Sequence, residues 1–92
     1  DPAVCKAVGS YCAELFGADD VLELDTLSGT EDFTAVAERI PAAMFHLGVG
    51  SIAEGHACGA HNPKMVVDES ALTRGAALYA YCAARYLAEH QD

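Results

Sequence analysis

Residues 42–50, AAMFHLGVG, carry the pattern that most restricts the possible fold. Side chains of two sets alternate there with a period of two, so that each set would lie on one side of an extended chain, which is typical of a strand. The apolar positions on one side are Phe45, Leu47 and Val49. Because a strand needs neighbours to satisfy its backbone hydrogen bonds, these residues predict a sheet. The glycines at positions 48 and 50 let another group approach the backbone closely.

The first helix is expected over residues 1–17. Asp1 can cap it, and Pro2 stands at the first helical position, where the missing N–H costs nothing. Gly17 is a natural end for the helix. Its buried stripe is expected to contain Val4, Val8, Tyr11 or Cys12, and Leu15.

Three further elements follow: a short strand at Val21, Leu22 and Leu24, a helix within residues 28–40 that Pro41 ends, and a long helix over residues 68–92. The second helix can be capped by Ser28 with Glu31 or by Thr30, and the last by Asp68 or Ser70. The expected inner faces are Phe33, Val36, Ala37 and Ile40 in the second helix, and Leu72, Ala76, Tyr79, Ala83 and Tyr86 or Leu87 in the last. Gly75 allows the last helix to pack closely.

This order of elements indicates an α/β fold, with helices layered on a sheet. Two strands are few for a complete sheet. The chain has 92 residues, of which 52% are hydrophobic, a large share for a single small domain. We therefore expect part of its surface to meet another chain or a further segment of the same protein.

The net charge of −9, from 14 acidic and five basic residues, argues against nucleic acid and anionic membranes as partners. No apolar run approaches the roughly 20 residues of a membrane span. A cytoplasmic location is the expectation. The four cysteines, Cys5, Cys12, Cys58 and Cys82, are expected to be reduced, since three of them lie in helical apolar patterns.

Two polar segments could bind a ligand. SGTEDF, residues 28–33, is a glycine turn before a helix, where free backbone N–H groups attract a carboxylate; ordinary helix capping is the alternative. The loop at residues 51–65 carries His56, Cys58 and His61, which are three ligand types for zinc, whereas structural zinc sites use four. Surface or loop-stabilising roles are the alternative for these three. Pro63 stiffens the backbone near His61.

The segments SGTEDF, IPAAMFHLGVGS and AHNPKMVVDESALTRGAALYAYCAARYL, in this order, resemble the C-terminal end of a family of metal-dependent amidohydrolases. The family includes hippurate hydrolases, N-acyl-amino-acid amidohydrolases, indole-acetyl-amino-acid hydrolases and carboxypeptidase G-type enzymes. The resemblance implies that residues 1–92 are the C-terminal portion of a three-layer, zinc-peptidase-like catalytic domain with a mixed sheet. They would follow an inserted lid and dimerisation domain that these residues do not contain.

The resemblance also implies roles for individual residues. His61 matches the family's last metal ligand, and Gly29, Thr30, Glu31 and Asp32 match a turn beside the substrate's carboxylate. His56 and Cys58 match no family position. The general-base glutamate and the other ligands would come from an N-terminal segment, so no catalytic residue is expected here and the chain alone is expected to be inactive.

The implied enzyme holds two divalent ions, zinc, manganese, cobalt or nickel, and hydrolyses the amide bond of N-acyl amino acids or related small amides. Its partners would be the N-terminal segment and, through the lid, a second copy in a homodimer. The alternative function is a small non-enzymatic domain that senses metal or thiol through His56, Cys58 and His61, or that binds a protein through its apolar surface.

Overall fold

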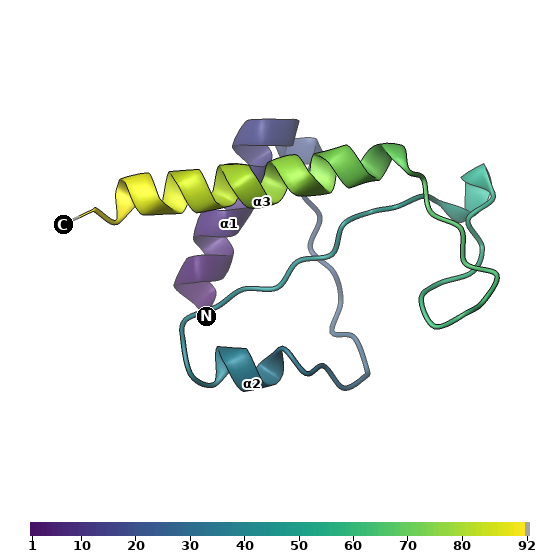
Figure 1. The fold of residues 1–92 in the computed structure, drawn as a ribbon, viewed down its shortest axis with the longest axis horizontal. Coiled ribbons are helices and arrows are strands. Elements are labelled where there is room, and N and C mark those ends of the chain that lie inside the picture. Colours follow the sequence, from purple (N-terminus) through teal and green to yellow (C-terminus); the bar gives the residue numbers. More distant parts are fainter. Residues whose placement is uncertain (92) are drawn as a thin grey trace. The chain divides into compact units, whose positions relative to one another are not determined.

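The structure, a computed structural model, describes residues 1–91. These residues form α1 (Pro2–Phe16), the 3-10 helix η1 (Ala18–Asp20), α2 (Thr34–Ala37), the 3-10 helix η2 (Ile52–Glu54) and α3 (Ser70–Glu89) (Figure 1). The chain divides into two compact units, and α3 contributes to both. Unit 1 comprises residues 1–45 and 78–92, and unit 2 comprises residues 46–77.

Helix α1 begins and ends where the sequence predicts. The Asp1 carboxylate accepts hydrogen bonds from the backbone N–H groups of Ala3, at 2.8 Å, and Val4, at 2.9 Å. Gly17 ends the helix with φ 97°, a conformation that favours glycine, and its N–H donates to the Ala13 carbonyl. These local caps fix the boundaries of α1.

The core of unit 1 lies where α1 crosses the second half of α3 (Figure 1). Tyr11, Cys12 and Leu78 are the buried side chains there, with 2%, 9% and 5% of their surface exposed. Val4, Val8 and Leu15 are half-buried, so the predicted stripe of α1 is confirmed. In the same unit, the rings of Phe45 and Tyr79 lie with their centroids 5.7 Å apart.

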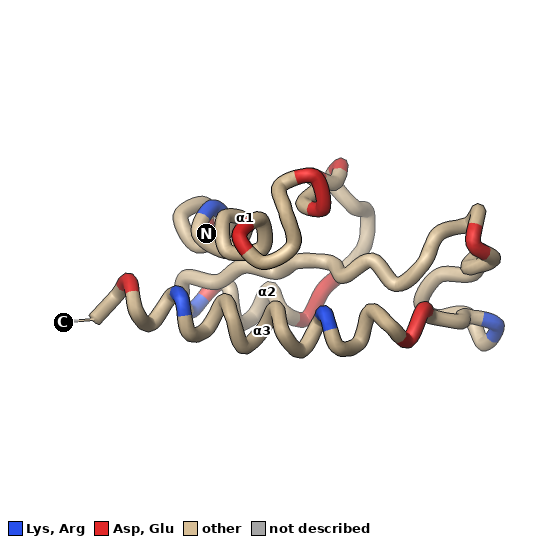
Figure 2. The backbone as a smooth tube through the Cα atoms, turned by 90° about the horizontal axis from the view of Figure 1, so that it is seen from above, with Lys and Arg blue, Asp and Glu red and all other residues tan. Residues whose placement is uncertain are grey.

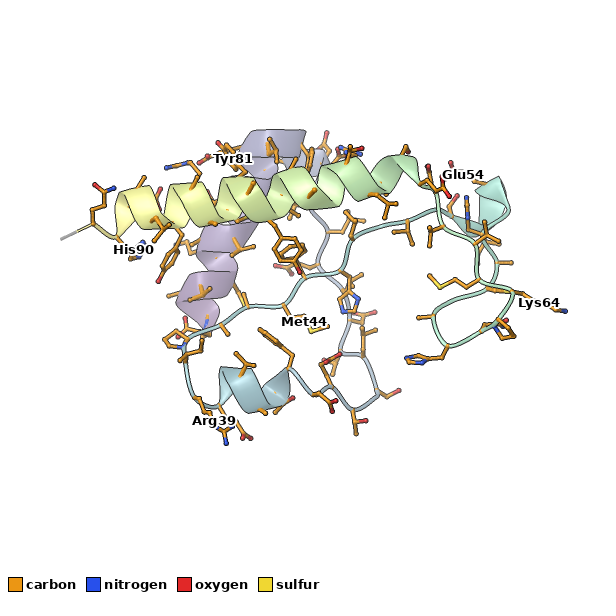
Figure 3. All side chains as sticks on the ribbon, in the orientation of Figure 1. Arg39, Met44, Glu54, Lys64, Tyr81 and His90 are labelled. Carbon is orange, nitrogen blue, oxygen red and sulfur yellow. The ribbon has the colours of Figure 1, made fainter. Side chains whose placement is uncertain are left out.

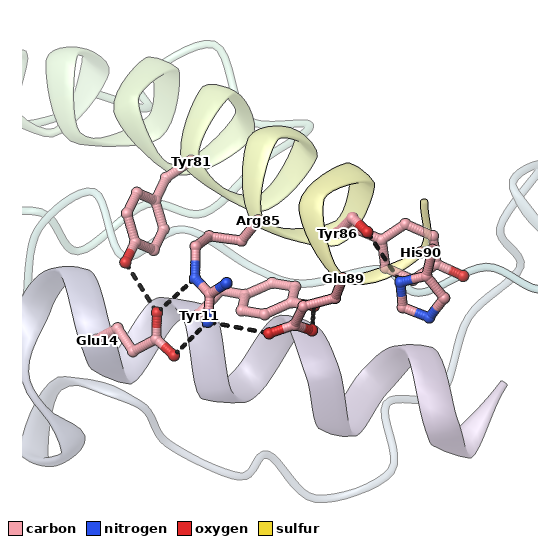
Figure 4. Close-up of polar contacts among 7 residues, drawn as sticks. All are labelled: Tyr11, Glu14, Tyr81, Arg85, Tyr86, Glu89 and His90. Atoms are coloured by element: carbon pink, nitrogen blue, oxygen red, sulfur yellow. Dashed lines mark hydrogen bonds and ion pairs between the residues drawn. The ribbon is translucent and has the colours of Figure 1, made fainter. Parts of the chain in front are cut away.

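A polar cluster holds the same two helices together, and we call it the α1–α3 clamp: Tyr11, Glu14, Tyr81, Arg85 and Glu89 (Figure 4). Glu14 accepts hydrogen bonds from Arg85 Nε at 2.9 Å, from Arg85 Nη2 at 3.1 Å and from the Tyr81 hydroxyl at 2.8 Å. Arg85 also pairs with Glu89 at 2.9 Å, and the Tyr11 hydroxyl donates to Glu89. The clamp therefore links one turn of α1 to two turns of α3.

No strand forms within residues 1–91. Residues 21–27 and 42–50 run without regular structure, and the backbone N–H groups of residues 42–49 donate no hydrogen bond inside the described part of the chain. The expected alternation survives in the exposure of the second segment. Phe45, Leu47 and Val49 are half-buried, whereas the intervening positions are exposed. The strands predicted at residues 21–24 and 42–50 are thus absent, because a strand requires a neighbour to pair with.

Helix α2 is shorter than the sequence predicts, and its predicted caps are wrong. The helix contains four residues, and Phe33 precedes it without any side-chain cap. Neither Ser28 nor Thr30 caps it; instead the Glu31 carboxylate accepts from the Phe33 N–H at 3.1 Å. Val36 and Ile40 of the expected inner face are 41% and 57% exposed. A four-residue helix with little burial lacks the packing that extends helices in proteins.

Helix α3 is confirmed, and its predicted cap Asp68 accepts from the Ser70 N–H at 3.0 Å and the Ser70 hydroxyl at 2.6 Å. Its predicted inner face is wrong. Leu72, Tyr79 and Leu87 are 60%, 73% and 67% exposed, while the buried residues are Ala71 and Leu78. Apolar residues cover two faces of this helix, so helical periodicity alone could not select the face that packs.

Three further sequence expectations concern close packing at Gly75, the acidic charge of the chain and the absence of a membrane span. A Cβ on Gly75 would lie 2.8 Å from Leu47 Cδ2, which confirms close packing at this glycine. Acidic positions are spread along the chain (Figure 2). None of the helices in the described part of the chain is long and apolar enough to span a membrane.

Candidate metal-ligand loop

Residues 50–67 form one closed loop of unit 2, which we call the His61 loop. At its base, the Asp68 N–H donates to the Val49 carbonyl at 2.6 Å. The Ser51 hydroxyl caps η2, because it accepts from the Glu54 N–H at 3.3 Å and donates to the Glu54 carboxylate at 2.7 Å. Gly55, at φ 96°, then ends η2 in a left-handed conformation. Both ends of the loop are therefore tied by hydrogen bonds.

His56 lies across the base of this loop. Its Nδ1 is 2.8 Å from the Val66 carbonyl oxygen, and its backbone N–H donates to the Ser51 carbonyl at 3.0 Å. The ring lies against Gly50, where an added Cβ would stand 2.3 Å from His56 Cδ2. The close approach that the sequence predicts at Gly50 is thus made by an imidazole, whereas Gly48 has open space around it.

A tight turn shapes the far end of the loop. The Asn62 side-chain oxygen accepts from the Lys64 N–H at 2.9 Å, and the Met65 N–H donates to the Asn62 carbonyl at 3.0 Å. Pro63 stands at the second turn position, which its fixed φ suits. The Lys64 side chain extends away from the loop (Figure 3). The turn begins immediately after His61.

His61 has φ 66°, and it is the single non-glycine residue with positive φ in the described chain. Histidine tolerates this region better than most residues, although a left-handed conformation costs about 1 kcal/mol. His61 is exposed, and its ring forms no hydrogen bond within residues 1–91. An exposed imidazole whose ring nitrogens form no hydrogen bond can coordinate a metal ion such as zinc.

The three residues considered as a local metal site are not brought together. No group of three or more His, Cys, Asp and Glu side chains in the described chain could hold a metal ion. Cys58 is a half-buried free thiol, and the Nδ1 of His56 faces a carbonyl oxygen. Residues 1–91 therefore do not complete a metal site by themselves.

The predicted carboxylate-binding turn, Gly29, Thr30, Glu31 and Asp32, belongs to unit 1. All four residues are exposed. Their backbone N–H groups donate no hydrogen bond inside the described residues, so these donors are available to a ligand. The two acidic side chains repel a carboxylate, which leaves the N–H groups as the attractive part of the turn.

The sequence matches the model of peptidase family M20/M25/M40 over residues 1–85. The chain belongs to this family. The M20 assignment agrees with the amidohydrolase resemblance that the motifs carry, and it implies a zinc-peptidase-like parent fold.

This M20 chain also resembles plant enzymes. It is 30% identical over 89 residues to the IAA-amino acid hydrolase ILR1-like 4 of Arabidopsis thaliana, an alignment that covers 97% of the chain and 20% of the relative. It is 36% identical over 74 residues to ILR1-like 6 of the same plant, covering 80% of the chain and 16% of the relative. The chain thus spans a fifth or less of the curated relatives it matches. No solved structure matches it with comparable significance.

Sequence reasoning missed two polar features of this M20 chain. The α1–α3 clamp has a signal in the spacing of Tyr81, Arg85 and Glu89, which repeat every four residues on one side of a helix. The contact of His56 with Val66 could have been inferred only from a weaker pattern in the sequence. Gly50, six residues before His56, leaves room for the histidine ring.

Proposed function

We propose that these residues are the C-terminal part of the catalytic domain of a two-metal amidohydrolase, in which His61 supplies one metal ligand. The observation that carries the proposal is the state of His61: an exposed imidazole without a hydrogen bond, held in a left-handed conformation at a turn. Backbone strain of this kind concentrates at functional sites. The M20 membership supports hydrolysis as the reaction class.

The substrates we propose are N-acyl amino acids, since the relatives are IAA-amino acid hydrolases. Bound zinc, manganese, cobalt or nickel ions would supply polarisation of the amide carbonyl and activation of water. The chain's own residues then have two tasks. His61 binds one ion through a ring nitrogen, and the N–H groups of Gly29 and Thr30 bind the substrate's carboxylate, with Glu31 and Asp32 beside it.

The remaining ligands and the general base belong, in this proposal, to an N-terminal segment of the same protein, separated from Asp1 by an inserted lid domain. The chain alone is then inactive. The alignments cover only 20% and 16% of the two relatives, which supports the view that these residues are a fragment of a larger hydrolase. A homodimer formed through the lid and a cytoplasmic location stay predictions.

The test is His61→Ala in the full-length protein that contains these residues. We expect the metal content to fall from about two ions to about one per protein and amide hydrolysis to be lost, because one ion loses a ligand. His46→Ala is the matched control, since His46 is an exposed histidine of the same unit and lies outside the His61 loop. Normal turnover and metal content in the His61 variant would contradict the assignment.

A zinc titration of residues 1–92 alone separates the alternative function. An isolated chain with one ligand binds zinc weakly. A tight one-to-one zinc complex of residues 1–92, with loss of the free Cys58 thiol, would favour a metal or thiol sensor over the hydrolase.

A further inference from the structure

The His61 loop is closed by two cross-loop hydrogen bonds of different kinds. The bond from the Asp68 N–H to the Val49 carbonyl, at 2.6 Å, involves only backbone atoms and does not use the side chain of either residue. The bond between His56 Nδ1 and the Val66 carbonyl, at 2.8 Å, depends on one side chain. The second bond therefore makes the closure of the loop sensitive to the identity of residue 56.

Gly50 is shaped to receive the His56 ring. A Cβ at position 50 would lie 2.3 Å from His56 Cδ2 and 2.4 Å from His56 Cγ, distances at which one of the two groups must move. Gly50 also has φ 132°, where other residues are strained. The ring is half-buried although it belongs to a loop. Gly50 and His56 thus form one packed contact at the base of the loop.

The contact also fixes the proton on the ring. A carbonyl oxygen only accepts hydrogen bonds, so His56 must carry a proton on Nδ1 to bond to Val66. An asparagine amide group occupies a place similar to that of Nδ1 and can donate in the same direction. A leucine of similar size has no donor. These two substitutions separate the hydrogen bond from side-chain volume.

We propose that His56 is a positioning residue for His61: its Nδ1–H···O=C bond to Val66, made across Gly50, closes residues 57–65 so that the His61 imidazole is presented in one orientation. The inference rests on the proposed metal role of His61 for its functional meaning. His61 is five residues after His56 and five before Val66, at the middle of the closed segment. A left-handed residue persists when its surroundings hold it, and fixing both ends of a short segment removes most of its freedom.

The first measurement is NMR of the labelled chain. We expect the His56 ring nitrogens to show the Nδ1–H tautomer, and residues 57–65 to have backbone order parameters near about 0.85. His56→Leu should lower the order parameters of these residues below about 0.6, while His56→Asn should largely restore them. Gly50→Ala should reproduce the effect of His56→Leu, because its Cβ displaces the ring.

His46→Leu is the matched control and should leave the loop ordered, since His46 lies outside it. The amide resonances of α1 and α3 report whether each variant remains folded. An Nε2–H tautomer in the unaltered chain, or a loop that stays ordered in the folded His56→Leu variant, would overturn the proposal. A His56→Asn variant as disordered as His56→Leu would also overturn it.

Metal binding by the full-length protein gives the second readout. A positioning residue behind a ligand typically changes metal affinity by about 10-fold to 100-fold, so His56→Leu should weaken binding by that factor and His56→Asn by less. If the loop loses order but His61→Ala leaves metal binding unchanged, the proposed function fails and the positioning role stands. If the loop keeps its order in His56→Leu, the positioning role fails, whatever the change in metal affinity.

Discussion

At the scale of single residues, the four thiols differ in their surroundings. Cys5 is exposed, Cys58 is half-buried, and Cys12 and Cys82 belong to the contact between α1 and α3. Burial, and then the neighbouring Cys12 thiol, raises the pKa of Cys82 above its ordinary value. All four thiols are free in the structure, and the reduced state in the cell stays a prediction.

We expect Cys5 to react with a thiol reagent at neutral pH at least about tenfold faster than Cys12 and Cys82, because Cys12 is buried from the reagent and the raised pKa of Cys82 leaves less thiolate to react. Cys58 should be intermediate. Mass spectrometry of partially alkylated chains measures the order, and Cys5→Ser should remove the fast phase alone. Equal rates for Cys5 and Cys82 would contradict the packing of α1 on α3.

Residue-scale sequence reasoning succeeded where the cause is local. Asp1, Pro2 and Gly17 define α1 because caps act within one turn. It failed for His56, whose partners Gly50 and Val66 are six and ten residues away. The proposed metal role of His61 rests on motif resemblance, since no group of three or more His, Cys, Asp and Glu side chains within residues 1–91 could hold a metal ion.

At the scale of elements, the α1–α3 clamp makes the packing of two helices depend on pH. Hydrogen bonds from Arg85, followed by that from Tyr81, lower the pKa of Glu14 from 4.5 to about 2. The hydrogen bond to Glu89 is the main cause that raises the pKa of Tyr11 from 10.0 to about 12. The folded state thus favours an ionised Glu14 and a protonated Tyr11.

The directions of these two pKa shifts set an acidic and an alkaline limit to the stability that the clamp contributes. A lowered carboxyl pKa stabilises the fold above the unfolded value, so the contribution of Glu14 is complete above pH 4.5 and disappears as the pH falls to about 2. A raised tyrosine pKa stabilises below the unfolded value, so the contribution of Tyr11 is complete below pH 10.0 and disappears by about pH 12.

Glu14→Gln should lower the melting temperature at pH 7 by a few degrees and reduce the loss of stability between pH 4.5 and about 2. The effect is modest because the side chains of Arg85 and Glu14 are 34% and 38% exposed. Glu23→Gln, an exposed acid outside the clamp, is the control. Thermal unfolding followed by circular dichroism measures both, and identical pH profiles for the two variants would contradict the clamp.

The helix faces illustrate which part of an element's packing a sequence can predict. The stripe of α1 was predictable because its other side is polar or small. In α3, the apolar side chains of Leu72, Tyr79 and Leu87 stay exposed, whereas Ala71 and Leu78 on another face are buried in the described chain. The polar partners of the clamp reinforce that choice, since Arg85 and Glu89 lie on the face that meets α1.

At the scale of the whole molecule, much apolar surface has no cover within residues 1–91. Leu22, Leu24, Leu72, Tyr79 and Leu87 are each at least 60% exposed. Exposed apolar patches mark surfaces that meet other protein. The sheet could be expected from the alternation at residues 42–50, but strand pairing is non-local and needs neighbours that the described chain does not contain.

This uncovered surface leads to a prediction about backbone protection. If residues 42–49 pair as a strand with the remainder of the enzyme, their N–H groups, which donate no hydrogen bond within the described chain, become protected. Hydrogen exchange should then be slower by roughly 100-fold or more in the full-length protein than in residues 1–92 alone. The helical amides of residues 80–88 should be protected in both and serve as the internal control. Fast exchange at residues 42–49 in an active full-length enzyme would mean that the alternating segment does not join a sheet, since a paired strand of the catalytic domain cannot leave its N–H groups open to water.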